Sequence, residues 1–124
     1  MIERSRAYFL FARIVFRPHH GPMQLDIRGR NLRLTPALLD HVDRRLRFSL
    51  GRFAARLSRV AVRVGDVNGP RGGIDKRCWI HLELGGRRAL TIEEVDADLY
   101  VAIDRASERA GRATERALAR LRAA

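Results

Sequence analysis

Five arginines near the end of the chain recur at a spacing that suits the binding of phosphate groups. They follow one another at steps of four, three, four and four residues: Arg105, Arg109, Arg112, Arg116 and Arg120. On a helix this spacing forms a row along one flank, about 22 Å long at a rise of about 1.5 Å per residue. The planar guanidinium group donates hydrogen bonds in a fixed fork that matches a phosphate. We therefore predict that this segment binds a polyanion.

The acidic residues of the same segment support this prediction. Asp104, Glu108 and Glu115 fall on the opposite flank of the expected helix. Solvated helices often mix the two signs through pairs four residues apart. Segregated charges favour a partner on the basic flank, with a solvated face that has no partner as the alternative.

A second stretch, "GPRGGIDKRC" (residues 69–78), could be a phosphate loop, half of a metal site or a hairpin. A phosphate loop needs Gly-Lys-Ser/Thr leading into a helix, whereas these glycines lead into a strand pattern. Cys78 is the only cysteine, and no histidine stands at a metal-ligand spacing from it. We predict a hairpin loop with a basic tip formed by Arg71, Lys76 and Arg77, and an inward-facing Cys78.

The composition restricts the class of protein. The 124 residues suit one domain, and 25 Lys and Arg against 14 Asp and Glu give a net charge of +11. A single cysteine excludes an intramolecular disulfide, and no stretch approaches the roughly 20 apolar residues of a membrane span. No nucleophile–base pair or carboxylate dyad stands out. We expect a cytoplasmic nucleic-acid-binding protein, not an enzyme, without metal, cofactor, membrane or small-molecule partner.

Hydrophobic periodicity predicts the elements that carry these residues. Alternation of period two indicates four strands, and a period of 3.6 indicates two helices. The strands lie at about 24–28, 60–64, 77–84 and 90–92, and the helices at 36–53 and from about 97 onward. The order is β-α-β-β-β-α, an α+β domain. We predict a four-stranded sheet with both helices packed on one face, as in double-stranded-RNA-binding folds.

Each expected helix has a capping residue and an apolar stripe. Thr35 followed by Pro36 suits the start of the first helix, and Asp96 suits the start of the second. The first stripe comprises Leu39, Val42, Leu46, Leu50 and Phe53. The second comprises Leu99, Ile103, Ala106, Ala110, Ala117 and Leu121.

The first helix also carries arginines beside its stripe. Arg45, Arg52 and Arg56 lie on the same rotational side as the row on the second helix, so the two rows would line one basic surface. Phe48 points away from the stripe and would either stack on a base or be buried by a bend of the helix. Trp79 falls on the far face of the sheet, where it either stacks on bases or, as we favour, covers the open face.

Residues 1–22 fit none of these elements. Basic residues flank a short apolar run that Arg13 interrupts, which fits a secretion signal poorly. We predict a dispensable or flexible extension, followed by one domain over residues 23–124.

Two motifs give the chain a family resemblance. "MQLDIRGRNLRLTPALLDHVDRRL" (residues 23–46) resembles the opening of the ribosome hibernation-promoting factor family, also called ribosome-associated inhibitor or sigma-54 modulation proteins. "DLYVAIDRASERAGR" (residues 98–112) resembles the second signature of that family, at the head of its last helix. The resemblance covers roughly residues 23–120 and implies the same order of elements. It also implies a short form, without the second domain of the long members.

The resemblance implies an inhibitor of translation. Such a protein binds rRNA of the small ribosomal subunit at the decoding region and blocks the tRNA and mRNA sites during dormancy or stress. The matching basic positions are Arg45, Arg109, Arg112 and Arg116, whereas Phe48 stands where lysine is common. The full candidate rRNA-binding set is Arg45, Arg52, Arg56, Arg71, Lys76, Arg77, Arg105, Arg109, Arg112, Arg116 and Arg120. Two alternatives stay open: a generic RNA-binding module and a protein-interaction factor.

Overall fold

The computed structural model describes residues 12–16, 25–67, 76–85 and 88–123. The elements in chain order are β1 (Ala12–Phe16), β2 (Leu25–Arg30), α2 (Pro36–Leu50), the 3-10 helix η1 (Gly51–Arg56), β3 (Leu57–Asp66), β4 (Lys76–Leu84), β5 (Ala89–Asp96) and α3 (Leu99–Ala123). From β2 onward this is the predicted β-α-β-β-β-α order, and the predicted α+β fold class is confirmed.

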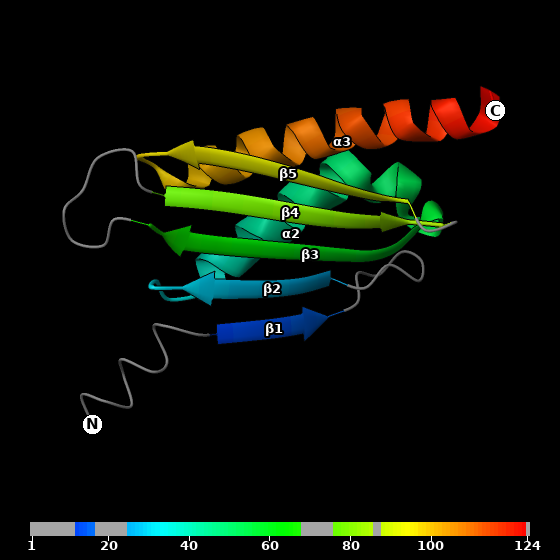
Figure 1. Cartoon of the computed structure of the whole chain (residues 1–124). Coiled ribbons are helices and arrows are strands. Elements are labelled where there is room, and N and C mark those ends of the chain that lie inside the picture. Colours follow the sequence, from blue (N-terminus) through cyan, green and yellow to red (C-terminus); the bar gives the residue numbers. More distant parts are fainter. Residues whose placement is uncertain (1–11, 17–24, 68–75, 86–87, 124) are drawn as a thin grey trace.

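The strands form one sheet in the order β1-β2-β3-β4-β5, with both helices on one face (Figure 1). β2 and β3 run parallel because α2 crosses over between them, and the other neighbours are antiparallel. α3 follows β5 and folds back along it. Among the described residues, no helix covers the opposite face of the sheet, which we call the open face.

The sheet has one strand more than the sequence predicted. β1 lies within residues 1–22, which we expected to precede the folded domain, and it pairs antiparallel with β2 from Ala12 opposite Gly29 to Phe16 opposite Leu25. The four predicted strands are present as β2 to β5, and β1 adds an edge strand that the sequence analysis did not predict. An edge strand exposes unpaired N–H and C=O groups, and an upstream segment with strand-forming residues such as Ile14 and Val15 satisfies them.

The predicted inward-facing strand residues form the core with the helices. Those fully buried are Leu25, Ile27, Val60, Val62, Val64, Cys78, Ile80, Leu82, Leu84 and Ile92. Leu90, near the start of β5, is half-buried. The alternation therefore identified the face of every strand from β2 to β5 that carries the helices.

The helix ends differ from the prediction in detail. The Thr35 hydroxyl accepts a hydrogen bond from the Leu38 N–H at 3.1 Å, as a capping residue should. α2 ends at Leu50 rather than Phe53, and η1 continues the chain. At α3 the cap is Asp98, whose carboxylate accepts from the Tyr100 N–H at 2.9 Å, whereas the predicted cap Asp96 accepts from the Asp98 N–H.

The buried stripes are also slightly rotated from those predicted. α2 buries Leu38, Val42, Leu46 and Leu50, while Leu39 and Phe53 are half-buried. α3 buries Ala102, Ile103, Ala106, Ser107, Ala110, Gly111, Thr114, Ala117 and Leu118. Most of these side chains are small, so α3 packs close to both the sheet and α2.

The two helices approach each other closely at Gly111. A Cβ atom there would lie 2.8 Å from the main-chain oxygen of Ser49 on α2. We expect Gly111→Ala to reduce the free energy of unfolding by about 1–3 kcal/mol, because overpacking forces backbone shifts. Thermal and denaturant unfolding of the full chain measure this.

Gly51 provides the matched control. It already has helical backbone angles, and a Cβ atom there would meet nothing within 4 Å. Gly51→Ala should leave stability unchanged or raise it by about 0.5–1 kcal/mol, because the unfolded chain loses freedom. An equal loss in both variants, or none in Gly111→Ala, would contradict the close crossing.

Candidate nucleic-acid interface

The first two arginines of the predicted row lean toward the end of β5. Arg105 forms an ion pair with Asp96 at 3.2 Å. Arg109 pairs with the carboxylate of Glu94 and donates to the main-chain oxygen of Glu93 at 3.0 Å. These guanidinium groups are partly neutralised before any ligand arrives.

The middle of the row is also compensated. Arg112 pairs with Glu108, one turn earlier on α3, at 2.7 Å. The charges of α3 are therefore less strictly segregated than the spacing indicated, because Glu108 and Arg112 meet on the solvent side of the helix.

The end of the row is different. Arg116 and Arg120 are exposed, and within the described ranges no carboxylate lies within ion-pair distance of either. Arg122 on the last turn, Arg56 on η1 and Arg88 before β5 share this property. The end of α3, η1 and the start of β5 lie at the same end of the molecule (Figure 1). We call these five residues the basic end.

The arginines of α2 face the acidic flank of α3. Arg45 forms an ion pair with Asp104 at 3.2 Å, and His41 contacts the same carboxylate at 2.7 Å. Arg52, on η1, pairs with Glu115 at 3.3 Å. The two arginine rows do not merge along their length, because Asp104 and Glu115 of α3 pair with Arg45 and Arg52 of the first row. Of the first row, only Arg56 belongs to the basic end together with Arg116 and Arg120.

Phe48 lies on this side of the molecule and is 85% exposed. The guanidinium of Arg45 lies 6.0 Å from the centre of its ring. This exposure excludes the alternative that a bend of the helix buries Phe48. The other alternative, that Phe48 stacks on a base of a partner, stays a prediction.

The predicted basic tip after Gly69 is only partly described. Arg71 lies outside the described residues. Lys76 and Arg77 belong to β4, where Lys76 pairs with Asp66 at 3.2 Å and Arg77 with Glu93 at 2.8 Å. The prediction that Lys76 and Arg77 form the tip of the hairpin loop was wrong, because the β3–β4 ladder extends to the pair Asp66–Lys76.

Cys78 faces the core, as predicted, and its side chain is fully buried. Burial raises the pKa of the thiol from 9.0 to about 12, and the negative charge of Glu94 adds to the shift. Among the described residues, no group of three or more His, Cys, Asp or Glu side chains could hold a metal ion. No described helix is long and apolar enough to cross a membrane.

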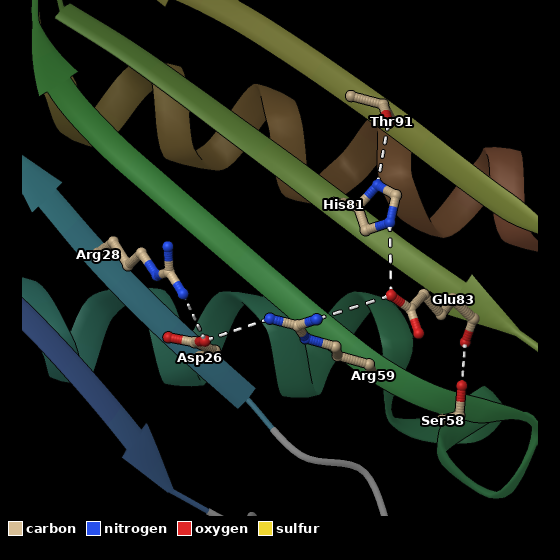
Figure 2. Close-up of polar contacts among 7 residues, drawn as sticks. All are labelled: Asp26, Arg28, Ser58, Arg59, His81, Glu83 and Thr91. Atoms are coloured by element: carbon tan, nitrogen blue, oxygen red, sulfur yellow. Dashed lines mark hydrogen bonds and ion pairs between the residues drawn. The ribbon is translucent and has the colours of Figure 1, made fainter.

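The open face of the sheet carries a polar network that the sequence analysis did not identify (Figure 2). Asp26, only 3% exposed, contacts Arg28 at 3.7 Å and Arg59 at 3.5 Å. Arg59 reaches Glu83 at 3.8 Å, and His81 lies between Glu83 and Thr91, at 3.7 Å and 3.1 Å. Alternation along each strand places these side chains on one face, but their mutual contacts depend on the register.

Trp79 stands beside this network and is half-buried, and its two predicted roles, covering the sheet and stacking on a base, both stay predictions. The guanidinium of Arg63 lies 4.6 Å from the centre of its ring. On the same strand, the His81 ring stacks on Trp79 with a centroid distance of 5.7 Å and an interplanar angle of 8°.

Comparison with known proteins adds a family. The model of the family described as "Sigma 54 modulation protein / S30EA ribosomal protein" matches residues 25–122. The solved N-terminal domain of Protein Y from Thermus thermophilus is 34% identical with a TM-score of 0.59, covering 78% of this chain and 97% of that domain. A ribosomal subunit interface protein from Coxiella burnetii shares the fold at 16% identity and a TM-score of 0.60, covering 81% of this chain and 98% of that one. No curated protein matches the chain.

The buried thiol gives a prediction for reactivity and pH. Native Cys78 should react far more slowly with a disulfide reagent at pH 8 than the chain unfolded in guanidinium, because the thiolate is the nucleophile. Its raised pKa also means that its contribution to stability is complete below about pH 9 and is lost as the pH rises toward 12. The measurements are labelling rates and denaturant unfolding across this range.

The control for the pH effect is Cys78→Ala, which has no ionising group and should lack this part of the alkaline loss. Rapid labelling of the native thiol would contradict the inward position of Cys78.

Proposed function

Since the chain belongs to the family of sigma-54 modulation proteins and S30EA ribosomal proteins, we propose that it binds the ribosome and inhibits translation. The partner is rRNA of the small subunit at the decoding region. Binding there excludes tRNA and mRNA and places the protein in the cytoplasm. Family membership and the likeness to Protein Y support this proposal.

The observation that carries the proposal is the basic end. Arg116, Arg120 and Arg122 lie on the last turns of α3, and no carboxylate of the described residues lies within ion-pair distance of any of them. η1, which carries Arg56, and the start of β5, next to Arg88, lie at the same end of the molecule. An arginine that has no carboxylate partner gains the full benefit of a phosphate contact and the release of counterions from RNA.

The paired arginines have a smaller role in this proposal. Exposed ion pairs contribute only about 0–1 kcal/mol, so Arg105 and Arg109 can exchange a carboxylate for a phosphate at small cost. The carboxylates of Asp96 and Glu94 remain nearby, however, and repel the same phosphate. Asp104 beside Arg45 and Glu115 beside Arg52 repel a phosphate in the same way.

The proposal predicts which arginines determine the salt dependence of ribosome binding. The double variant Arg116→Ala/Arg120→Ala should weaken co-sedimentation with small subunits and lower the slope of log affinity against log salt by about two, one for each phosphate that the variant no longer neutralises. Arg105→Ala/Arg109→Ala should lower the slope less. Affinities measured between low and physiological salt give these slopes.

The control is Arg44→Ala/Arg47→Ala on α2. Both residues are exposed and paired one turn away, with Asp40 at 3.0 Å and Asp43 at 2.7 Å. An unchanged slope in the Arg116/Arg120 variant, or an equal loss in this control, would remove the basic end from the interface. Equal affinity for isolated duplex RNA and small subunits would favour a generic RNA-binding module instead.

Residues 1–22 should be dispensable for ribosome binding. The family match begins at Leu25, and a chain that starts at Met23 keeps β2 paired with β3. Loss of the β1–β2 ladder should lower the melting temperature, because the edge of β2 is uncovered. Co-sedimentation and thermal unfolding of the shortened chain test this, and loss of binding in a folded shortened chain would show that residues 1–22 contribute contacts.

A further inference from the structure

The open face of the sheet contains a hollow of about 670 Å³ at the end where β2 and β3 finish and β4 begins. Its size lies within the range of small-molecule sites. Among the described residues that line it, none belongs to a helix or to the basic end. Its basic and aromatic lining residues are Arg28, Arg30, Arg63, Arg77 and Trp79.

The register of the strands explains the hollow. Arg28, Arg63, Trp79 and Glu93 form one row across β2, β3, β4 and β5. Two residues further along, Arg30 and Arg77 flank Gly65 in a second row. Gly65 has no side chain to fill the space between the two arginines.

The charges around the hollow are unequally satisfied. Arg28 contacts Asp26 at 3.7 Å, and Arg77 pairs with Glu93 at 2.8 Å. Arg30 and Arg63 are exposed, and no carboxylate of the described chain lies within ion-pair distance of either. Two guanidinium groups are therefore available to an anion.

An aromatic column forms one wall. The ring of Trp79 is covered by the Arg63 guanidinium at 4.6 Å and by the parallel His81 ring. Thr91 and Glu83 hold His81 in place (Figure 2). A guanidinium has two flat faces, so a base can stack on the outer face of the Arg63 guanidinium. Alternatively, the base can displace that guanidinium and stack directly on Trp79.

We propose that this hollow binds a nucleoside phosphate, with the base on the Arg63–Trp79 column and the phosphate between Arg30 and Arg63. The ligand is either a free nucleotide or one nucleotide of an RNA strand. The site is separate from the basic end and goes beyond the proposed function. Charge alone would suit any anion, but the stacked column beside the arginines selects an anion that carries a flat ring.

Trp79 is the only tryptophan, so its fluorescence reports directly on the site. The full chain is titrated with AMP and GMP, with quenching corrected against free tryptophan at equal absorbance. Saturable quenching that weakens with salt is expected. Quenching that never saturates would overturn the proposal.

Substitutions separate the site from nonspecific attraction to a basic protein. Arg30→Ala/Arg63→Ala should weaken AMP binding by at least about tenfold, the loss expected for one or two charge-assisted hydrogen bonds. The control Arg116→Ala/Arg120→Ala removes the same charge from the helical side and should leave AMP binding unchanged. Equal affinities in both double variants would overturn the proposal.

Two further measurements cover the remaining outcomes. If Arg30→Ala/Arg63→Ala lowers the melting temperature, the variant Arg63→Lys is measured instead. It keeps the charge but lacks the flat group, so it should still weaken AMP binding. Wild-type affinity for AMP in a folded Arg63→Lys chain would overturn the stacking. The stacking would also be overturned if inorganic phosphate displaced AMP at equal concentration.

A short oligoribonucleotide identifies the source of the ligand. Tighter binding than AMP, lost in the same Arg30/Arg63 variant, assigns the hollow to an RNA strand, and weaker binding assigns it to a free nucleotide.

Discussion

The close contact between α2 and α3 at Gly111 is the constraint on which the arrangement of the arginines depends. The two backbones approach so closely there that a Cβ atom would lie 2.8 Å from a main-chain oxygen. Ala102, Ala106 and Ala110 continue the contact toward the sheet and are fully buried. With so little side chain between the elements, α3 has one rotational setting, because a turn of one residue, about 100°, would bring a charged side chain into the core. That setting directs Arg109 toward β5.

The distribution of charge follows from how α3 folds back along β5. β5 is preceded by Arg88 and ends with Glu93, Glu94 and Asp96, so its sequence runs from basic to acidic. α3 returns antiparallel to it, which brings the start of the helix beside the acids and its end beside the basic start of the strand (Figure 1). The same arginine spacing therefore has two electrostatic environments: neutralised at the start of the helix and uncompensated at its end.

The fold could be predicted from the sequence because its signals are local. Alternation in β3 and β4 and the apolar stripes of the helices depend on residues close together in the chain. Contacts between distant elements have no such signal: His41 and Asp104 are 63 residues apart, and their contact requires the crossing of α2 and α3. The pairing of β1 with β2 is of the same kind, since strand propensity at Ile14 and Val15 does not specify an edge. For this reason Arg56, Arg116 and Arg120 of the basic end were predicted from the sequence, whereas Arg88 and Arg122 were missed, and so were the acidic partners of the other arginines.

The two basic regions lie on opposite sides of one rigid layer. Val64 and Cys78 are buried under the helices, while Arg63, Arg77 and Trp79, next to them in β3 and β4, line the hollow on the other face. Neighbouring residues of the same two strands therefore face the two sides of the sheet. Because the interior between them is close-packed, the two basic regions can move little relative to each other. One straight RNA duplex cannot lie on both sides of the sheet. If both sites are filled on the ribosome, the nucleotide in the hollow must come from a strand that passes around the edge of the domain, or from a separate molecule.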